Sequence, residues 1–424
     1  MRYNPISTYI FTTAILLLFC TTLHAQINSS KGGINTVNSA VPFLRIIPDA
    51  RGGGMGDVGI ATSVDPNASF YNASKLAFAK RKLGFSLSYA PWLRALGITD
   101  IFMTHFTFYY KVTPNDVIHT SLKFFSLGDI EFTDNAGNSI GNGSPRELSF
   151  DAGYTRRLGK HFGLGVAFRY IYSNLAQGQS IGSVPIKAGH AGAADLTATY
   201  NLDMKVGKRK KMDGNFMAGI AITNMGSKIS YTADAVEKDF IPANLGIGVG
   251  FRLQPTKQHE WGIYLDANKL LVPTPDSTDS DGDNIPDFKQ QSSFKGLFTS
   301  LGDAPGGFKE EMREWTMGIG TEYWYDHIFG VRAGYFLEAK DKGYRRFVST
   351  GIGVKYSVFG LDFSYLIPTG GARNPLDNTF RFTLKFDFAK VGGNKVDIDG
   401  DDINDATDKV DKGTRKRLKK QKAD

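Results

Sequence analysis

The carboxylates at 279–287 have the types and spacing that a calcium site requires. Asp279, Asp281 and Asp283 occupy every second position around a glycine, and Asp287 closes the motif. Calcium prefers about six to eight oxygen ligands, which alternating aspartates on a turn can supply. The same spacing returns at 397–405. We therefore expect calcium at Asp279, Asp281, Asp283 and Asp287, with an acidic, solvated loop as the alternative interpretation.

No other set of residues has the spacing of a catalytic or cofactor site. The glycine run at 52–56 lacks the G-K-[ST] ending of a phosphate-binding loop. The seven histidines lack the paired spacing of a zinc site. The G-x-S-x-G runs at 137–141 and 178–182 lie in expected long loops and not at the strand-to-helix turn that a nucleophilic serine requires. The one cysteine, Cys20, lies in the N-terminal leader. These features predict a protein that is not an enzyme and requires no further cofactor.

We expect the acidic loop to connect two β-strands, because apolar and polar residues alternate with a period of two in the surrounding sequence. In 380–388, Phe or Leu occupies one face, whereas Arg381, Thr383, Lys385 and Asp387 occupy the other. Successive side chains of a strand point to opposite faces, so this pattern is typical of a barrel with apolar side chains toward lipid. It predicts an all-β protein, a fourteen-stranded antiparallel transmembrane β-barrel, with strands near 85–92, 102–112, 117–127, 147–157, 162–174, 190–204, 216–224, 244–254, 260–268, 315–325, 329–338, 347–357, 360–366 and 380–388.

The connections between these strands alternate in length. Those after even-numbered strands are mostly tight, whereas those after odd-numbered strands are mostly long, at 128–146, 175–189, 225–243, 269–314 and 367–379. Short periplasmic turns and long extracellular loops are typical of outer-membrane barrels. We therefore expect a protein of the cell outer membrane with both termini in the periplasm and the acidic loop outside.

Aromatic residues gather near the expected strand ends. An aromatic girdle at the two membrane interfaces is the expected role, with substrate contact as the alternative. The residues concerned are Trp92, Tyr109, Tyr110, Tyr170, Tyr172, Trp261, Tyr264, Tyr323, Trp324 and Tyr325.

The two ends of the chain differ in composition from the strands. Arg2, the apolar stretch 10–19 and the small residue Ala25 follow the order of an export signal. The formal charge of +8 is concentrated at 205–211 and 409–422 without interleaved aromatic residues, so we expect no nucleic-acid partner. The expected domains are a signal peptide at 1–25, an N-terminal segment and hatch at 26–82, the barrel at 83–388, and a disordered periplasmic tail at 389–424, acidic and then basic.

The segment before the first strand is rich in glycine and moderately apolar, without strand alternation. Such a segment needs burial, and we expect it to form a hatch inside the lumen. Glycines also recur on the expected lumen face of the strands, for example Gly163, Gly165, Gly318 and Gly320. Two explanations remain open: the glycines let the wall curve, or they make room for the hatch.

Two motifs in this segment resemble a known family. The run Asn67-Ala68-Ser69-Phe70-Tyr71-Asn72-Ala73-Ser74 resembles the hatch motif D-A-S-x-F-x-N-P-A of fatty-acid-transporter-like (FadL-like) barrels, with Asn67 in place of Asp and Ala73-Ser74 in place of Pro-Ala. More narrowly, 43–57 and 87–93 are similar to the PorV family of the Bacteroidetes type IX secretion system. The resemblance covers about 40–388, and the tail lies outside it.

The resemblance implies an outer-membrane component that binds cargo proteins through their C-terminal signal domains. Its implied partners are the type IX translocon barrel, those cargo domains, the surface attachment complex to which cargo is shuttled, and outer-membrane lipid. The wider family implies an alternative, an outer-membrane transporter of hydrophobic small molecules. A third interpretation is an adhesin or structural porin that uses the acidic loop.

Overall fold

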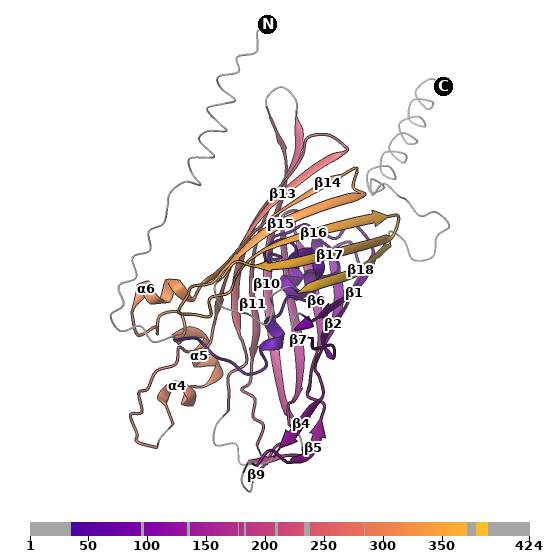
Figure 1. Cartoon of the computed structure of the whole chain (residues 1–424). Helices are drawn as coiled ribbons and strands as arrows, with labels where there is room; N and C mark the ends of the chain where they lie inside the picture. The colour runs from indigo at the N-terminus through magenta and orange to yellow at the C-terminus, as the bar shows by residue number, and fades with distance from the viewer. Residues whose placement is uncertain are drawn as a thin grey trace, which may run out of the picture. The chain divides into compact units, whose positions relative to one another are not determined.

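Fourteen antiparallel strands close into one barrel in the computed structural model (Figure 1). The structure describes residues 35–94, 97–133, 136–176, 178–181, 184–207, 211–232, 238–283, 285–370 and 379–388. The ring closes where the first and last strands pair, from Leu83 with Phe388 to Tyr89 with Phe382. Its strands are β1 (Leu83–Pro91), β2 (Ile101–Lys111), β3 (Asp116–Leu127), β6 (Arg146–Leu158), β7 (Phe162–Asn174), β10 (Gly189–Val206), β11 (Met212–Gly226), β12 (Asn244–Gln254), β13 (His259–Leu270), β14 (Thr316–Tyr325), β15 (Phe329–Leu337), β16 (Arg346–Tyr356), β17 (Phe359–Pro368) and β18 (Phe380–Phe388).

The period-two pattern sets which face of each strand is solvent-accessible. On β18, Phe382 is 44% exposed, whereas the neighbouring Arg381 and Thr383 are buried. This inverts the arrangement of a soluble protein, since the polar side chains point into the ring and the apolar ones point out, toward lipid. All fourteen predicted strands are confirmed, and among the described residues no helix is both long and apolar enough to cross a bilayer.

Several predicted boundaries and loops differ from those observed. β10 and β11 extend beyond the predicted ranges as a polar hairpin, in which the exposed Lys205 pairs with Asp213. Short elements within the long loops have no clear alternation and were not predicted from the sequence. They are the hairpin β4 (Ile130–Thr133) and β5 (Ser139–Gly143), the pair β8 (Ser180–Ile181) and β9 (Val184–Pro185), and the helices α4 (Asp287–Gln290), α5 (Ser293–Thr299), α6 (Phe308–Glu311) and η4 (Met312–Glu314).

The aromatic prediction is only partly correct. Trp261 and Tyr325 are more than half exposed on the outer face of the ring. Tyr109, Tyr264 and Trp324 are instead buried on the inner face, with Tyr264 packed against Met55 and Val58. These three cannot belong to a girdle, because their position in the strand alternation turns them away from lipid.

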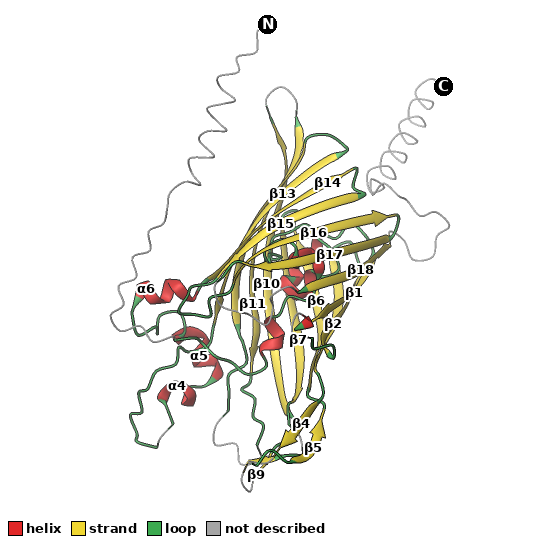
Figure 2. Ribbon diagram, viewed as in Figure 1, coloured by secondary structure: helices red, strands yellow, loops and turns green. Residues whose placement is uncertain are grey.

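Residues 41–79 lie against the inner face of the ring. They contain the short helices η1 (Pro42–Arg45), α2 (Ala50–Gly53), α3 (Ala68–Tyr71) and η2 (Ala73–Phe78), drawn in red among the strands in Figure 2. The Ala50 amide donates to Thr383 Oγ1 on β18 at 2.8 Å, and the Ser74 amide donates to Thr197 Oγ1 on β10 at 3.1 Å. Lys123 on β3 donates to the Ile46 carbonyl at 2.7 Å. We call residues 41–79 the inner segment.

Wall glycines make room for the inner segment. A Cβ placed on Gly334 would lie 2.0 Å from the Met55 carbonyl carbon, and one on Gly320 would lie 2.4 Å from the Met55 carbonyl oxygen. Both distances are shorter than any normal contact. Close approach of the inner segment therefore explains the absence of side chains at these positions.

We predict that Gly334→Ala destabilises the barrel by about 1–3 kcal/mol, because a methyl group must displace the inner segment backbone. Gly192→Ala is the matched control, since a Cβ there would meet no atom within 4 Å. We expect its effect to stay within about 0.5 kcal/mol. Urea unfolding in lipid vesicles measures both, and equal stability of the two variants would contradict the packing argument.

Candidate functional site

Six charged side chains form a closed ring that joins the inner segment to the wall. Arg51 pairs with Glu322 on β14 at 2.7 Å, Glu322 with Arg332 on β15 at 2.7 Å, and Arg332 with Asp362 on β17 at 2.9 Å. Asp362 then contacts Lys385 on β18, Lys385 lies 3.6 Å from Asp65, and Asp65 returns to Arg51 at 3.1 Å. Three cations alternate with three anions. We call this set the six-charge ring.

The six-charge ring is almost entirely buried. The side chains of Glu322, Arg332 and Asp362 are at most 2% exposed, and Asp65, the most open member, is 14% exposed. A buried charge without a partner is strongly unfavourable, so each member requires its two neighbours. Arg51 and Asp65 come from the inner segment, and therefore the segment completes a network that the wall alone leaves open.

A second buried ionic network belongs to the wall alone. Arg169 on β7 pairs with Asp151 on β6 at 2.5 Å and with Asp195 on β10 at 3.0 Å. The same guanidinium also donates to Asn224 on β11. Neither network was predicted from the sequence. Their residues are far apart along the chain, and the one local signal was a charged side chain on an inward position.

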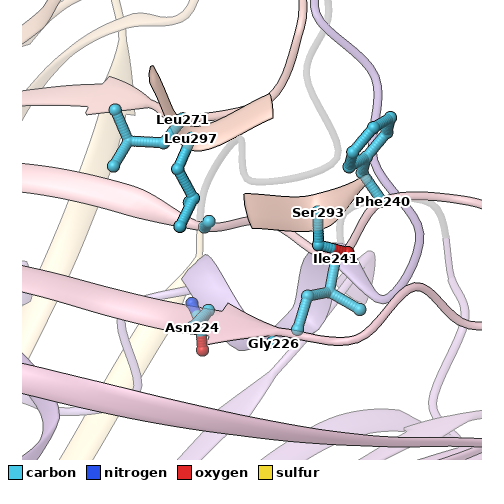
Figure 3. Close-up of a pocket in the computed structure, with 8 residues that line it drawn as sticks. Asn224, Gly226, Phe240, Ile241, Leu271, Ser293 and Leu297 are labelled. Atoms are coloured by element: carbon cyan, nitrogen blue, oxygen red, sulfur yellow. The ribbon is translucent and has the colours of Figure 1, made fainter. Parts of the chain in front are cut away.

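The long loops lie at one end of the ring, which we call the long-loop end. Helix α5 packs there on the end of β11, and Gly296 lies so close that an added Cβ would be 3.0 Å from a Phe240 ring carbon. Figure 3 shows the small pocket beneath this helix, and its lining is mostly apolar and without a charged side chain. It is lined by Asn224, Gly226, Phe240, Ile241, Ala243, Leu271, Ser293 and Leu297.

Three of the four predicted calcium ligands come together. Asp279, Asp281 and Asp287 each have a carboxylate oxygen within 4.8 Å of the others. Asp283 is not part of this group. Its carboxylate accepts from the Ile285 amide at 2.8 Å and from the Gln290 side chain at 3.1 Å. Hydrogen bonds from the Ser280 hydroxyl and amide lower the pKa of Asp287, which keeps it ionised. The second motif, at 397–405, lies outside the described residues.

A second acidic group already has a cation. Asp303, Glu311 and Glu314 also have oxygens close together, but Lys269 Nζ lies 2.5 Å from Glu311 and 2.6 Å from Glu314. Burial acts to lower the pKa of Lys342 nearby, but hydrogen bonds to Glu310 and Glu314 outweigh it and raise the pKa. These ion pairs hold α6 and η4 against the end of β13 and the connection that follows β15.

We predict that Glu322→Gln loosens the inner segment and makes the barrel conduct ions. Removing one partner of a buried ion pair costs about 3–5 kcal/mol, and this change leaves Arg51 and Arg332 without their shared carboxylate. Asp151→Asn is the matched control, because it removes a buried carboxylate from the network that excludes the inner segment. Planar bilayer recordings should show open currents only for Glu322→Gln. Similar currents from both variants would contradict a specific role for the six-charge ring.

Comparison with known proteins identifies the family. The family model described as type IX secretion system protein PorV matches residues 29–277, whereas no curated protein matches the chain. Similar solved structures include the Ralstonia pickettii toluene transporter TbuX, with 12% identity over 81% of this chain and 99% of that chain, at a TM-score of 0.40. The P. putida toluene transporter TodX shares 10% identity over 82% of this chain and 99% of its own, at a TM-score of 0.44. A Pseudomonas aeruginosa FadL homologue shares 10% identity over 84% and 99%, at a TM-score of 0.39. Because the matched family model covers more than half of the sequence, the chain belongs to the PorV family of the type IX secretion system.

Proposed function

We propose that this outer-membrane protein binds cargo proteins through their C-terminal signal domains and shuttles them from the translocon barrel to the surface attachment complex. One observation supports the proposal: the inner segment is largely buried against the inner face of the ring, while folded elements are concentrated at the long-loop end. A barrel occupied by its own chain is poorly suited to conduct folded protein. Contacts on its loops are therefore the more favourable route for handling cargo.

The proposal includes a topology and a division of the chain. The long-loop end faces the outside, and both termini lie in the periplasm, since short turns face the periplasm in barrels of this class. Residues 1–25 are a signal peptide, the inner segment acts as the hatch of a 26–82 unit, and 389–424 form a periplasmic tail. We assign the chain no catalytic activity, because in this scheme the chemistry belongs to its partners.

We predict that shortening the long loops blocks cargo delivery without reducing barrel abundance. One variant replaces the β4–β5 hairpin, 130–143, and another replaces α4 and α5, 275–301, with short glycine–serine linkers. Shortening the β10–β11 extension at the opposite end is the control. The measurement is the amount of cargo at the cell surface and in the medium. Normal export by both loop variants would argue against the shuttle.

A specific observation keeps the small-molecule transporter as the second candidate. Inward-facing Met103, Phe125 and Ile171 form an apolar cluster with Phe43 and Leu44 of the inner segment. Such a lining would suit a hydrophobic solute if the inner segment moved aside. Uptake of a hydrophobic probe into cells, lost on deletion of the protein while cargo export continued, would favour the transporter.

We also propose that the acidic loop binds calcium through Asp279, Asp281 and Asp287, with Asp283 at the edge of the site. The convergence of three carboxylates around one point supports this proposal.

We predict that calorimetry with calcium gives heat for the wild type and none for Asp281→Asn/Asp287→Asn. Asp283→Asn should retain most of the heat, since that carboxylate lies outside the group of three. Equal heats for all three proteins would leave only the solvated-loop interpretation.

A further inference from the structure

Helices α5 and α6 present an unusual combination of side chains on their outer surface. Phe294, Phe298 and Phe308 are 72%, 62% and 80% exposed. The first two are four residues apart on α5, with ring centroids 5.2 Å apart in an edge-to-face contact. Phe168, on the lipid-facing side of β7, is 73% exposed, so these rings are as open as one that meets lipid. Such a group is unfavourable in water and indicates a surface that is normally covered.

Cations accompany these apolar side chains. Lys295 follows Phe294 and Lys309 follows Phe308, and both lysines are exposed. Met312, 46% exposed, is followed by Arg313, which pairs with Asp341 at 2.9 Å. We call Phe294, Lys295, Phe298, Phe308, Lys309 and Met312 the aromatic–cation face.

The acidic side chains of the same segment point the other way. Glu310 binds Lys342 at 2.7 Å, and Glu311 binds Lys269 at 2.5 Å, both on the barrel side. Asp303 accepts from the Thr274 amide and hydroxyl at 3.1 and 3.0 Å. Asp341, whose side chain is 31% exposed, is paired with Arg313. The aromatic–cation face is therefore apolar and positively charged.

The position of this face points to lipid as its partner. Met317 and Ile319, at the start of β14, are exposed on the outer side of the ring. Met312 lies just before them in the chain, in η4, which the pairs of Lys269 with Glu311 and Glu314 hold at the end of β13. Figure 1 shows α5 and α6 beside the ends of the strands. Exposed apolar side chains therefore lie on both sides of the junction between η4 and β14.

We propose that the aromatic–cation face rests on anionic lipid headgroups of the leaflet at the long-loop end, with its phenylalanines in the acyl boundary and its lysines at phosphates. Aromatic and apolar side chains flanked by lysine are what an interfacial segment requires. This contact would fix the depth of α5 and α6 relative to the membrane surface. The proposal is separate from the proposed shuttle function, because it does not depend on cargo binding.

Spin labels test the proposal in the full-length protein. Single cysteines replace Phe294, Phe298 or Phe308 in a Cys20→Ser background, and the labelled proteins are reconstituted in vesicles of phosphatidylcholine and phosphatidylglycerol. Phe168→Cys is the lipid reference, and Asn142→Cys, exposed on β5, is the water reference. We expect the three labels to be more accessible to oxygen than to a water-soluble nickel complex, as is expected for a label at Phe168→Cys. Accessibility matching that of Asn142→Cys would overturn the proposal.

A charge variant separates lipid from protein as the partner. We expect the spin label at position 298 to insert more deeply when the vesicles contain phosphatidylglycerol than when they contain phosphatidylcholine alone. The double variant Lys295→Gln/Lys309→Gln should abolish this difference in depth. Lys160→Gln/Lys257→Gln removes two exposed lysines elsewhere and should leave it unchanged. No response to phosphatidylglycerol in the parent protein would overturn the proposed headgroup contact. Labels that are water-exposed in vesicles but shielded from both reagents in native membranes would assign the face to a protein.

Discussion

Polar side chains that point into a closed barrel must find partners there, and the rest of this architecture follows from that constraint. Lipid requires the apolar face of each strand to point outward, so Arg, Lys, Asp and Glu are directed inward. The wall satisfies one group of these charges by itself, through Arg169, Asp151 and Asp195. The other group, Glu322, Arg332, Asp362 and Lys385, closes only when Arg51 and Asp65 of the inner segment are present. The inner segment is therefore a structural component of the barrel interior.

The strands were predictable from the sequence because a period of two is a local signal. The 380–388 pattern alone indicates which residues face lipid, and Arg381 and Thr383 are buried as expected. The six-charge ring was not predictable, since Arg51 and Glu322 are 271 positions apart and only the register of the ring brings them together. Helices α4 to α6 are too short for a helical period to emerge. Their positions depend on contacts distant in sequence, such as the packing of α5 against Phe240 and the pairing of Glu311 in α6 with Lys269 on β13.

At the candidate calcium site, the spacing of aspartates in the sequence predicts which carboxylates lie near one another but not which of them converge on one point. Alternating aspartates place carboxylates near one another, and three of them do converge. The fourth, Asp283, lies outside this group although it has the same spacing. The glycines illustrate the opposite case, since two explanations were open until the contacts of Met55 with Gly320 and Gly334 decided between them. The spacing of residues in the sequence therefore identifies candidate site residues, whereas tertiary contacts determine which of them come together.

The last strand, β18, contacts the N-terminal part of the described chain in two places, in the barrel wall and in its interior. β1 pairs with β18 in the wall, and inside it the Ala50 amide reaches Thr383 across 333 positions of sequence. Arg381 and Lys385, on the same last strand, also contact Asp57 and Asp65. The last described strand thus carries partners of the inner segment. Contacts of such sequence separation form slowly because a long loop must first be closed. The contacts of the inner segment with β18 can therefore form only after that strand has arrived, so a chain truncated before β18 lacks both its seam and these interior contacts.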